Sequence, residues 1–347
     1  MSAVLEPSTA APTQPAGGLG GLLRAEAHRF LARRFIRVLL AVAVVGWALG
    51  VVLALMNYET PSAGTLAAAQ ATQQEQIEMQ NSYREECLAD PTRPDDVPAD
   101  SYCGPEATPE NTPLSWYLNP APFSLSEDAR DGAVGVAAAV SALAFLIGGT
   151  FVGAEWSSRS MVALLFWETR RPRVMGAKVL VTAAATAVIG ALAQAAWLGT
   201  AELLQAVAGD GVSPPDGFWS DLLAAQGRGV LLVMCAGLLG FGLTNLMRNT
   251  GAALGVAFVY VAIVENAVRA LRPAWQPWLL TNNAAALVVP DGITLYWSTD
   301  DLDASGLPTY QDVEYLLTNG QAAAYLAVVT AVVVGVGVAL FSRRDLH

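Results

Sequence analysis

The sequence is poor in lysine, histidine and cysteine. Its 347 residues include one lysine, Lys178, with two histidines and three cysteines. So few and so scattered side chains form neither a histidine-based catalytic triad nor a cluster of metal ligands. Lys178 also lacks the glycine spacing and the following hydroxyl residue of a phosphate-binding P-loop. We therefore expect no catalytic residue, no metal site and no bound cofactor, and we expect that the chain is not an enzyme.

Charged residues are scarce overall. They make up 14% of the chain, whereas 54% of the residues are hydrophobic; soluble domains carry roughly 25% charged residues. The net charge is −11, and 14 of the 30 acidic residues lie within residues 59–131. This composition predicts a membrane protein, and its acidic bias argues against nucleic acid as a partner.

Six apolar stretches are long enough to cross ~30 Å of hydrocarbon as helices. We therefore predict an all-α polytopic membrane protein with six transmembrane helices. Residues 1–18 are expected to form a disordered tail, 57–131 and 271–320 two polar outer regions, and 154–173 a loop. The predicted spans are residues 35–56, 132–153, 174–206, 228–247, 250–270 and 321–341.

Residues 19–34 carry a basic amphipathic pattern. Leu23, Ala27 and Phe30 fall on one helical face. This predicts a helix in the membrane interface, although a basic flank of the first span would give a similar composition. The charged residues spread over the other face: Arg24, Glu26, His28, Arg29 and Arg33.

The distribution of basic residues predicts the orientation. Thirteen arginine and lysine residues fall on the side of the two termini and six on the other side. The positive-inside rule then places both termini in the cytoplasm and residues 57–131 outside it. There, Cys87 and Cys103 could form a disulfide that contributes on the order of 3 kcal/mol; two unpaired thiols are the alternative.

The basic loop after the second span has an ordered pattern. Glu155 comes first, and an apolar i, i+3, i+4 edge follows it. A helix carboxyl end disfavours an acid, so a cation should compensate Glu155. The candidates are Arg33, Arg34 and Arg37 of the preceding amphipathic helix. We hypothesise that this pair transmits loop movement to the spans; a simple surface ion pair is the alternative.

Residues 22–37, 149–180 and 341–346 together resemble the permease subunits of type-2 ATP-binding-cassette exporters, particularly actinobacterial ones. The resemblance implies a multi-pass protein of the bacterial plasma membrane, paired with a second permease that is identical or paralogous. It also implies separate ATPase subunits that bind ATP and Mg²⁺ and dock on the loop, which would act as a coupling helix. The residues that it assigns to this coupling are Glu155, Ser158, Arg159, Met161, Leu164, Leu165, Arg170 and Arg171.

Four polar residues at membrane depth are candidates for a substrate path, namely Gln194, Thr244, Asn245 and Glu265. Hydrogen bonding between helices, or solvation at the membrane boundary, would equally explain them. A second function also remains open. The chain could be a membrane-anchored structural or sensory protein whose outer region binds a ligand.

Overall fold

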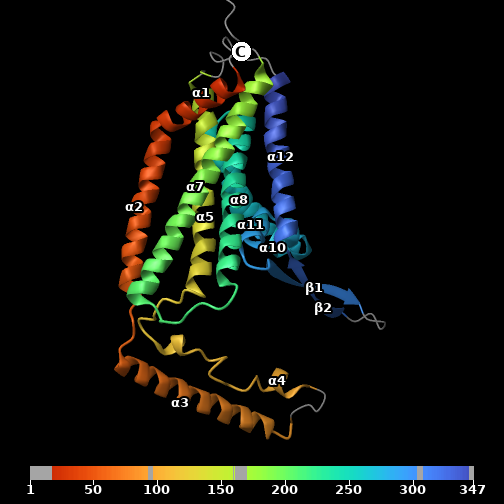
Figure 1. The fold of residues 1–347 in the computed structure, drawn as a ribbon. Coiled ribbons are helices and arrows are strands. Elements are labelled where there is room, and N and C mark those ends of the chain that lie inside the picture. Colours follow the sequence, from red (N-terminus) through yellow and green to blue (C-terminus); the bar gives the residue numbers. More distant parts are fainter. Residues whose placement is uncertain (1–17, 93–96, 159, 161–169, 303–307, 344–347) are drawn as a thin grey trace, which may run out of the picture. The chain divides into compact units, whose positions relative to one another are not determined.

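The computed structural model describes residues 18–92, 97–158, 160, 170–302 and 308–343 (Figure 1). Six helical stretches are long and apolar enough to span a membrane, as predicted. Their bounds exceed the predicted ones by a few residues, except that α8 begins about ten residues before residue 228. The six are α2 (Arg34–Asn57), α5 (Asp128–Ser157), α7 (Arg171–Ala208), α8 (Phe218–Met247), the continuous stretch Thr250–Leu271 and α12 (Asn319–Arg343).

The stretch Thr250–Leu271 is not a uniform α-helix. It consists of α9 (Thr250–Val259), the π-helical segment η2 (Tyr260–Val264) and α10 (Glu265–Leu271). At the end of η2 the backbone N–H of Glu265 donates to the carbonyl of Tyr260, five residues earlier. One extra residue is therefore accommodated in this turn.

The remaining elements that the structure describes are helices of various lengths and one hairpin. Strands β1 (Ile293–Leu302) and β2 (Pro308–Leu317) pair antiparallel, with Ile293 opposite Leu317. The all-α prediction is therefore wrong for the region 271–320, where β-branched and aromatic residues follow a turn at Gly292 (φ 92°). The other helices are α1 (Leu19–Ala32), α3 (Ala63–Leu88), α4 (Ala99–Tyr102), η1 (Leu114–Tyr117), η3 (Pro273–Trp278) and α11 (Leu280–Val288).

The chain divides into two compact units. We call Met1–Ala41, Ala137–Leu192 and Gly227–His347 unit 1. Unit 2 comprises Val42–Val136 and Ala193–Gln226. Each unit has its own buried apolar cluster.

The core of unit 1 forms where α1 meets the spans. Figure 1 shows α1 at the end of unit 1 where α7 begins and α12 ends. Phe30 of α1 packs edge-on against Phe151 of α5, with ring centroids 5.1 Å apart. The apolar face predicted to lie in the membrane interface thus packs on protein. The buried members of this cluster are Phe30, Ile36, Ile147, Phe151, Val152, Met175, Val181, Phe241 and Phe341.

Within unit 1, α5 and α8 approach each other backbone to backbone. A Cβ added to Gly148 would lie 1.9 Å from the carbonyl oxygen of Gly237. A Cβ on Gly240 would lie 2.1 Å from the carbonyl oxygen of Phe145. Glycine at these positions therefore permits a crossing that a side chain would block.

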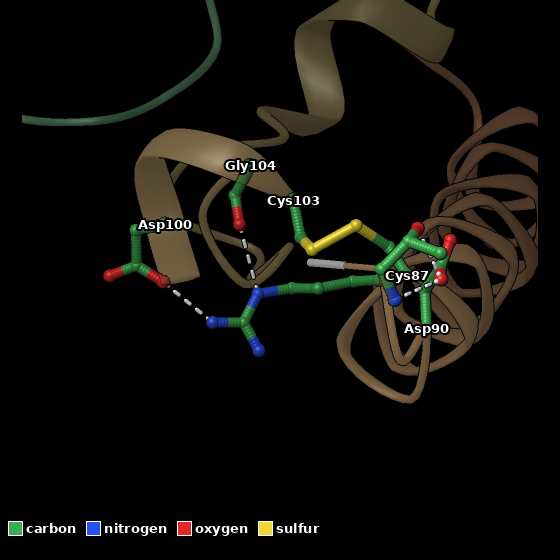
Figure 2. The surroundings of a disulfide bond; sticks show 7 residues. Cys87, Asp90, Asp100, Cys103 and Gly104 are labelled. Carbon is green, nitrogen blue, oxygen red and sulfur yellow. Dashed lines mark hydrogen bonds and ion pairs between the residues drawn. A yellow bond between two sulfur atoms is a disulfide. The ribbon is translucent and has the colours of Figure 1, made fainter. Parts of the chain in front are cut away.

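In unit 2, the end of α3 is fastened to the segment that follows it. Cys87 and Cys103 form the predicted disulfide. Arg84, one turn earlier, donates from Nε to the carbonyl of Gly104 at 2.9 Å and pairs with Asp100 at 2.6 Å (Figure 2). A covalent link and a side-chain clamp thus close the same loop.

Removing the disulfide by the double substitution C87S/C103S should loosen this loop. The bridge spans 16 residues, so its loss should cost about 3 kcal/mol of local stability. Amide exchange around Cys103 should then accelerate by roughly a hundredfold, as read by hydrogen–deuterium exchange. The control is C235S, which removes a free cysteine elsewhere. Equal exchange in both variants would contradict the prediction.

Candidate functional site

The chain's single lysine lies fully buried inside unit 1. Lys178, in the first turns of α7, has no exposed side-chain area. Its Nζ lies 2.6 Å from an oxygen of Glu26 on α1 and 2.7 Å from an oxygen of Glu155 on α5. One ammonium group therefore connects three helices.

Two arginines extend this contact on either side. Arg29 donates to the other oxygen of Glu26 at 2.8 Å, and Arg33 donates to the other oxygen of Glu155 at 3.0 Å. The result is an alternating series of charges, Arg29–Glu26–Lys178–Glu155–Arg33, which we call the ion cluster. With three cations and two anions, it carries one net positive charge.

The three central residues of the ion cluster, Glu26, Lys178 and Glu155, are shielded from water. Lys178 Nζ lies 5.3 Å, and the Arg33 guanidinium carbon 5.7 Å, from the centroid of the Phe151 ring. Both cations are thus placed for cation–π attraction. Burying a lysine without partners would be costly, so its two carboxylates are required for this packing.

The position of Glu26 corrects the sequence analysis. We predicted it on the charged face of the amphipathic helix, but its side chain is buried. Glu26 follows Leu23 by three residues and precedes Phe30 by four, so helical periodicity places it on the apolar stripe. A single acid within that stripe was the signal that could have identified it.

Of the three predicted partners of Glu155, only Arg33 pairs with it among the described contacts. Arg33 makes the contact already described. Arg37 instead donates to the carbonyl of Ala32 at 3.2 Å. Arg34 lines a cavity beside the ion cluster. Lys178, which the sequence did not connect with Glu155, is a further partner of this carboxylate.

The ion cluster lies at both ends of the predicted coupling loop. Glu155 is in the last turn of α5, where Ser158 Oγ donates to the carbonyl of Ala154 at 2.8 Å. Arg170 precedes α7 and Arg171 begins it, and each has an interaction partner. Arg159, Met161, Leu164 and Leu165 lie outside the residues that the structure describes.

The four substrate-path candidates are divided between the two units. Gln194, in unit 2, is buried and donates to the carbonyl of Ala133 at 3.0 Å. In unit 1, Thr244 and Asn245 are buried on α8, and Asn245 accepts a hydrogen bond from the Trp156 indole at 3.2 Å. For Gln194 and Asn245, the contacts between helices match the alternative interpretation.

Glu265 holds a neighbouring helix in unit 1. Its buried carboxylate accepts from the backbone N–H of Thr281 at 3.1 Å and also contacts the Thr281 hydroxyl. Arg269 pairs with the same carboxylate at 3.2 Å. Since Thr281 lies in the first turn of α11, Glu265 satisfies one of the free N–H groups there.

Replacing Glu265 with alanine should loosen α11. The change removes the acceptor for Thr281 and leaves Arg269 without its carboxylate, at a cost of about 2 kcal/mol. Amide exchange in the first turn of α11 should rise at least tenfold, measured by hydrogen–deuterium exchange. The matched control is E202A, because Glu202 is exposed on α7; an equal response in both variants would refute the anchoring role.

These features define a class rather than a particular protein. Six candidate membrane-spanning helices make the chain a polytopic membrane protein. Among the described residues, no group of three histidine, cysteine or acidic side chains is placed to hold a metal ion. A scan against protein-family models found no match, and searches of curated proteins and of solved structures likewise found none.

Proposed function

We propose that the chain is the permease subunit of an ATP-binding-cassette exporter in a bacterial plasma membrane. It would form the substrate path with a second permease and would be driven by separate ATPase subunits. The observation that carries the proposal is the ion cluster. It joins α1 to the two helices, α5 and α7, that flank the loop on which an ATPase would dock.

The ion cluster offers a route from the loop to the spans. A force on residues 158–170 acts first on the end of α5 and the start of α7. Lys178 binds Glu155, so these two helix ends resist separation. Lys178 also binds Glu26, so α1 follows any displacement of the pair. A closing ATPase dimer would therefore move three helices together rather than bend a loop.

Co-purification tests the docking part of this proposal. We expect the chain to bind an ATPase encoded beside it in the genome. Deletion of residues 157–167 should abolish that binding, because the apolar edge of the loop is lost. If no ATPase binds, or if binding survives the deletion, docking on this loop is wrong.

A second substitution tests transmission separately from docking. E155Q keeps the loop but weakens the contacts of Glu155 with Arg33 and Lys178. In reconstituted vesicles, the variant should still bind the ATPase but lose stimulated ATP hydrolysis and transport. Unchanged hydrolysis and transport would show that the cluster is structural only.

The alternative function has its own supporting observation. Residues 57–131 contain 14 acidic and three basic residues and carry the disulfide. A stapled, strongly acidic outer segment also suits a membrane-anchored protein that binds a ligand. The test is to truncate this segment and to measure ATPase binding and transport. If both are retained, the exporter function is favoured.

A further inference from the structure

A basic cavity of about 900 Å³ lies beside the ion cluster in unit 1. Among the residues that the structure describes, no aspartate or glutamate lines it. Its polar wall consists of side chains from α1, from the start of α2, from α5 and from the turn between α8 and α9. The lining residues that matter here are Arg29, Arg33, Arg34, Arg248, Thr250 and Gly251.

The four arginines differ in their partners within the part of the chain that the structure describes. Arg29 and Arg33 are held by the carboxylates of the ion cluster. Arg34 and Arg248 pair with no carboxylate in the described part of the chain. The cavity therefore presents two guanidinium groups that have no carboxylate partner among the described residues, and guanidinium groups are the side chains best suited to bidentate contact with phosphate oxygens.

Arg248 has an unusual backbone conformation and a fixed side chain. It occupies the left-handed region, with φ 53°, where glycine or asparagine would fit with less strain. Its guanidinium carbon lies 4.7 Å from the centroid of the Trp156 ring, so stacking fixes the side chain at the cavity. The strained backbone of the turn between α8 and α9 and the stacking on Trp156 thus hold the positive charge of Arg248 at the cavity.

The start of α9 adds to the positive potential. Asn249 caps the helix by accepting from Ala252 N–H at 3.1 Å, and the next two residues, Thr250 and Gly251, line the cavity. The amino end of a helix carries a partial positive charge and free N–H groups that favour anions. The helix end and the two arginines therefore favour the same class of ligand.

Part of the wall is apolar. Phe35, Ile36 and Ala154 line it, and the first membrane-spanning helix begins at Arg34. A free inorganic anion would leave this apolar wall unused. A lipid would fill both parts, with its phosphate among the arginines and its glycerol and first methylene groups against the wall.

We propose that this cavity binds the headgroup of an anionic phospholipid. The site would fasten α1 and the α8–α9 turn to the membrane surface next to the ion cluster. This goes beyond the proposed transport function and does not depend on an ATPase. Basic pockets of this kind between membrane helices suit phosphate-bearing headgroups.

Native mass spectrometry of the purified full chain tests the proposal. Phosphatidylglycerol should bind more tightly than phosphatidylcholine. The double variant R34Q/R248Q should lose about twentyfold in phosphatidylglycerol affinity, and R34Q alone about fivefold, with phosphatidylcholine binding unchanged. Arg34 is exposed, so the single variant keeps the test readable if the double variant unfolds.

The control is R272Q, which removes an exposed arginine at the far end of α10. It should bind phosphatidylglycerol like the unaltered chain. Equal affinity for the two lipids, or an equal loss in R272Q, would overturn the proposal. Complete displacement of the lipid by millimolar inorganic phosphate would also overturn it, since the ligand would then be a free anion.

Discussion

Replacing Lys178 with methionine should lower the free energy of unfolding by about 3–5 kcal/mol. The substitution keeps an unbranched side chain, one atom shorter, but removes the cation between Glu26 and Glu155, whose side chains are 0% and 4% exposed. Two buried carboxylates would then face each other without the cation between them. Reversible unfolding in mixed detergent micelles, followed by circular dichroism, measures the effect.

A second substitution in the same cluster separates charge from packing. E26Q added to K178M removes one of the stranded carboxylates and leaves Glu155 with Arg33. The double variant should therefore recover more than half of the lost stability. As a control, R24M removes an exposed charge from α1 and should change stability by about 0.5 kcal/mol at most. If K178M is no less stable than R24M, the cluster does not hold the helices together.

Replacing Gly148 with alanine should cost about 3 kcal/mol or more. The new Cβ would lie 1.9 Å from the carbonyl oxygen of Gly237, so α5 and α8 would have to separate at their crossing. A backbone oxygen cannot move aside as a flexible side chain can. Thermal unfolding in detergent is the measurement.

Gly135 provides the matched control on the same helix. A Cβ added there meets no atom within 4 Å. Since alanine favours helix over glycine by about 1 kcal/mol, G135A should be neutral or slightly stabilising. Equal unfolding temperatures for G148A and G135A would show that the close approach of α5 and α8 is not required.

The spans could be predicted because length and hydropathy are local properties. A run such as Arg34–Asn57 is long and apolar enough to span a membrane by itself. The disulfide was also accessible, because Cys87 and Cys103 share a polar region on one side of the predicted membrane. The hairpin was missed because residues 271–320 were judged by their polar composition alone, which does not reveal the β-branched and aromatic residues within them.

The sequence predicted only one of the contacts of the ion cluster, between Glu155 and Arg33. The misplaced charge of Glu155 at a helix end predicted a basic partner, and Arg33 lies there. The contact between Lys178 and Glu26 spans 152 residues of sequence and follows from how three helices pack. The residue spacing within α1 or within α7 does not indicate that Glu26 and Lys178 are in contact. Only the location of an acid on an apolar stripe and of a lone lysine in an apolar run hinted at it.

The π-helical turn of η2 should make the span Thr250–Leu271 tolerant of the deletion of one residue. A regular α-helix rotates by about 100° per residue. Deleting one residue within α8 would therefore rotate the part of the helix after the deletion by that angle relative to the part before it. The segment Tyr260–Val264 already contains one residue more than a regular turn. Deleting Ala262 would restore an ordinary helix and leave α9 and Glu265 in their present phase. In-frame loss of one codon should therefore be accepted here and rejected at the α5–α8 crossing.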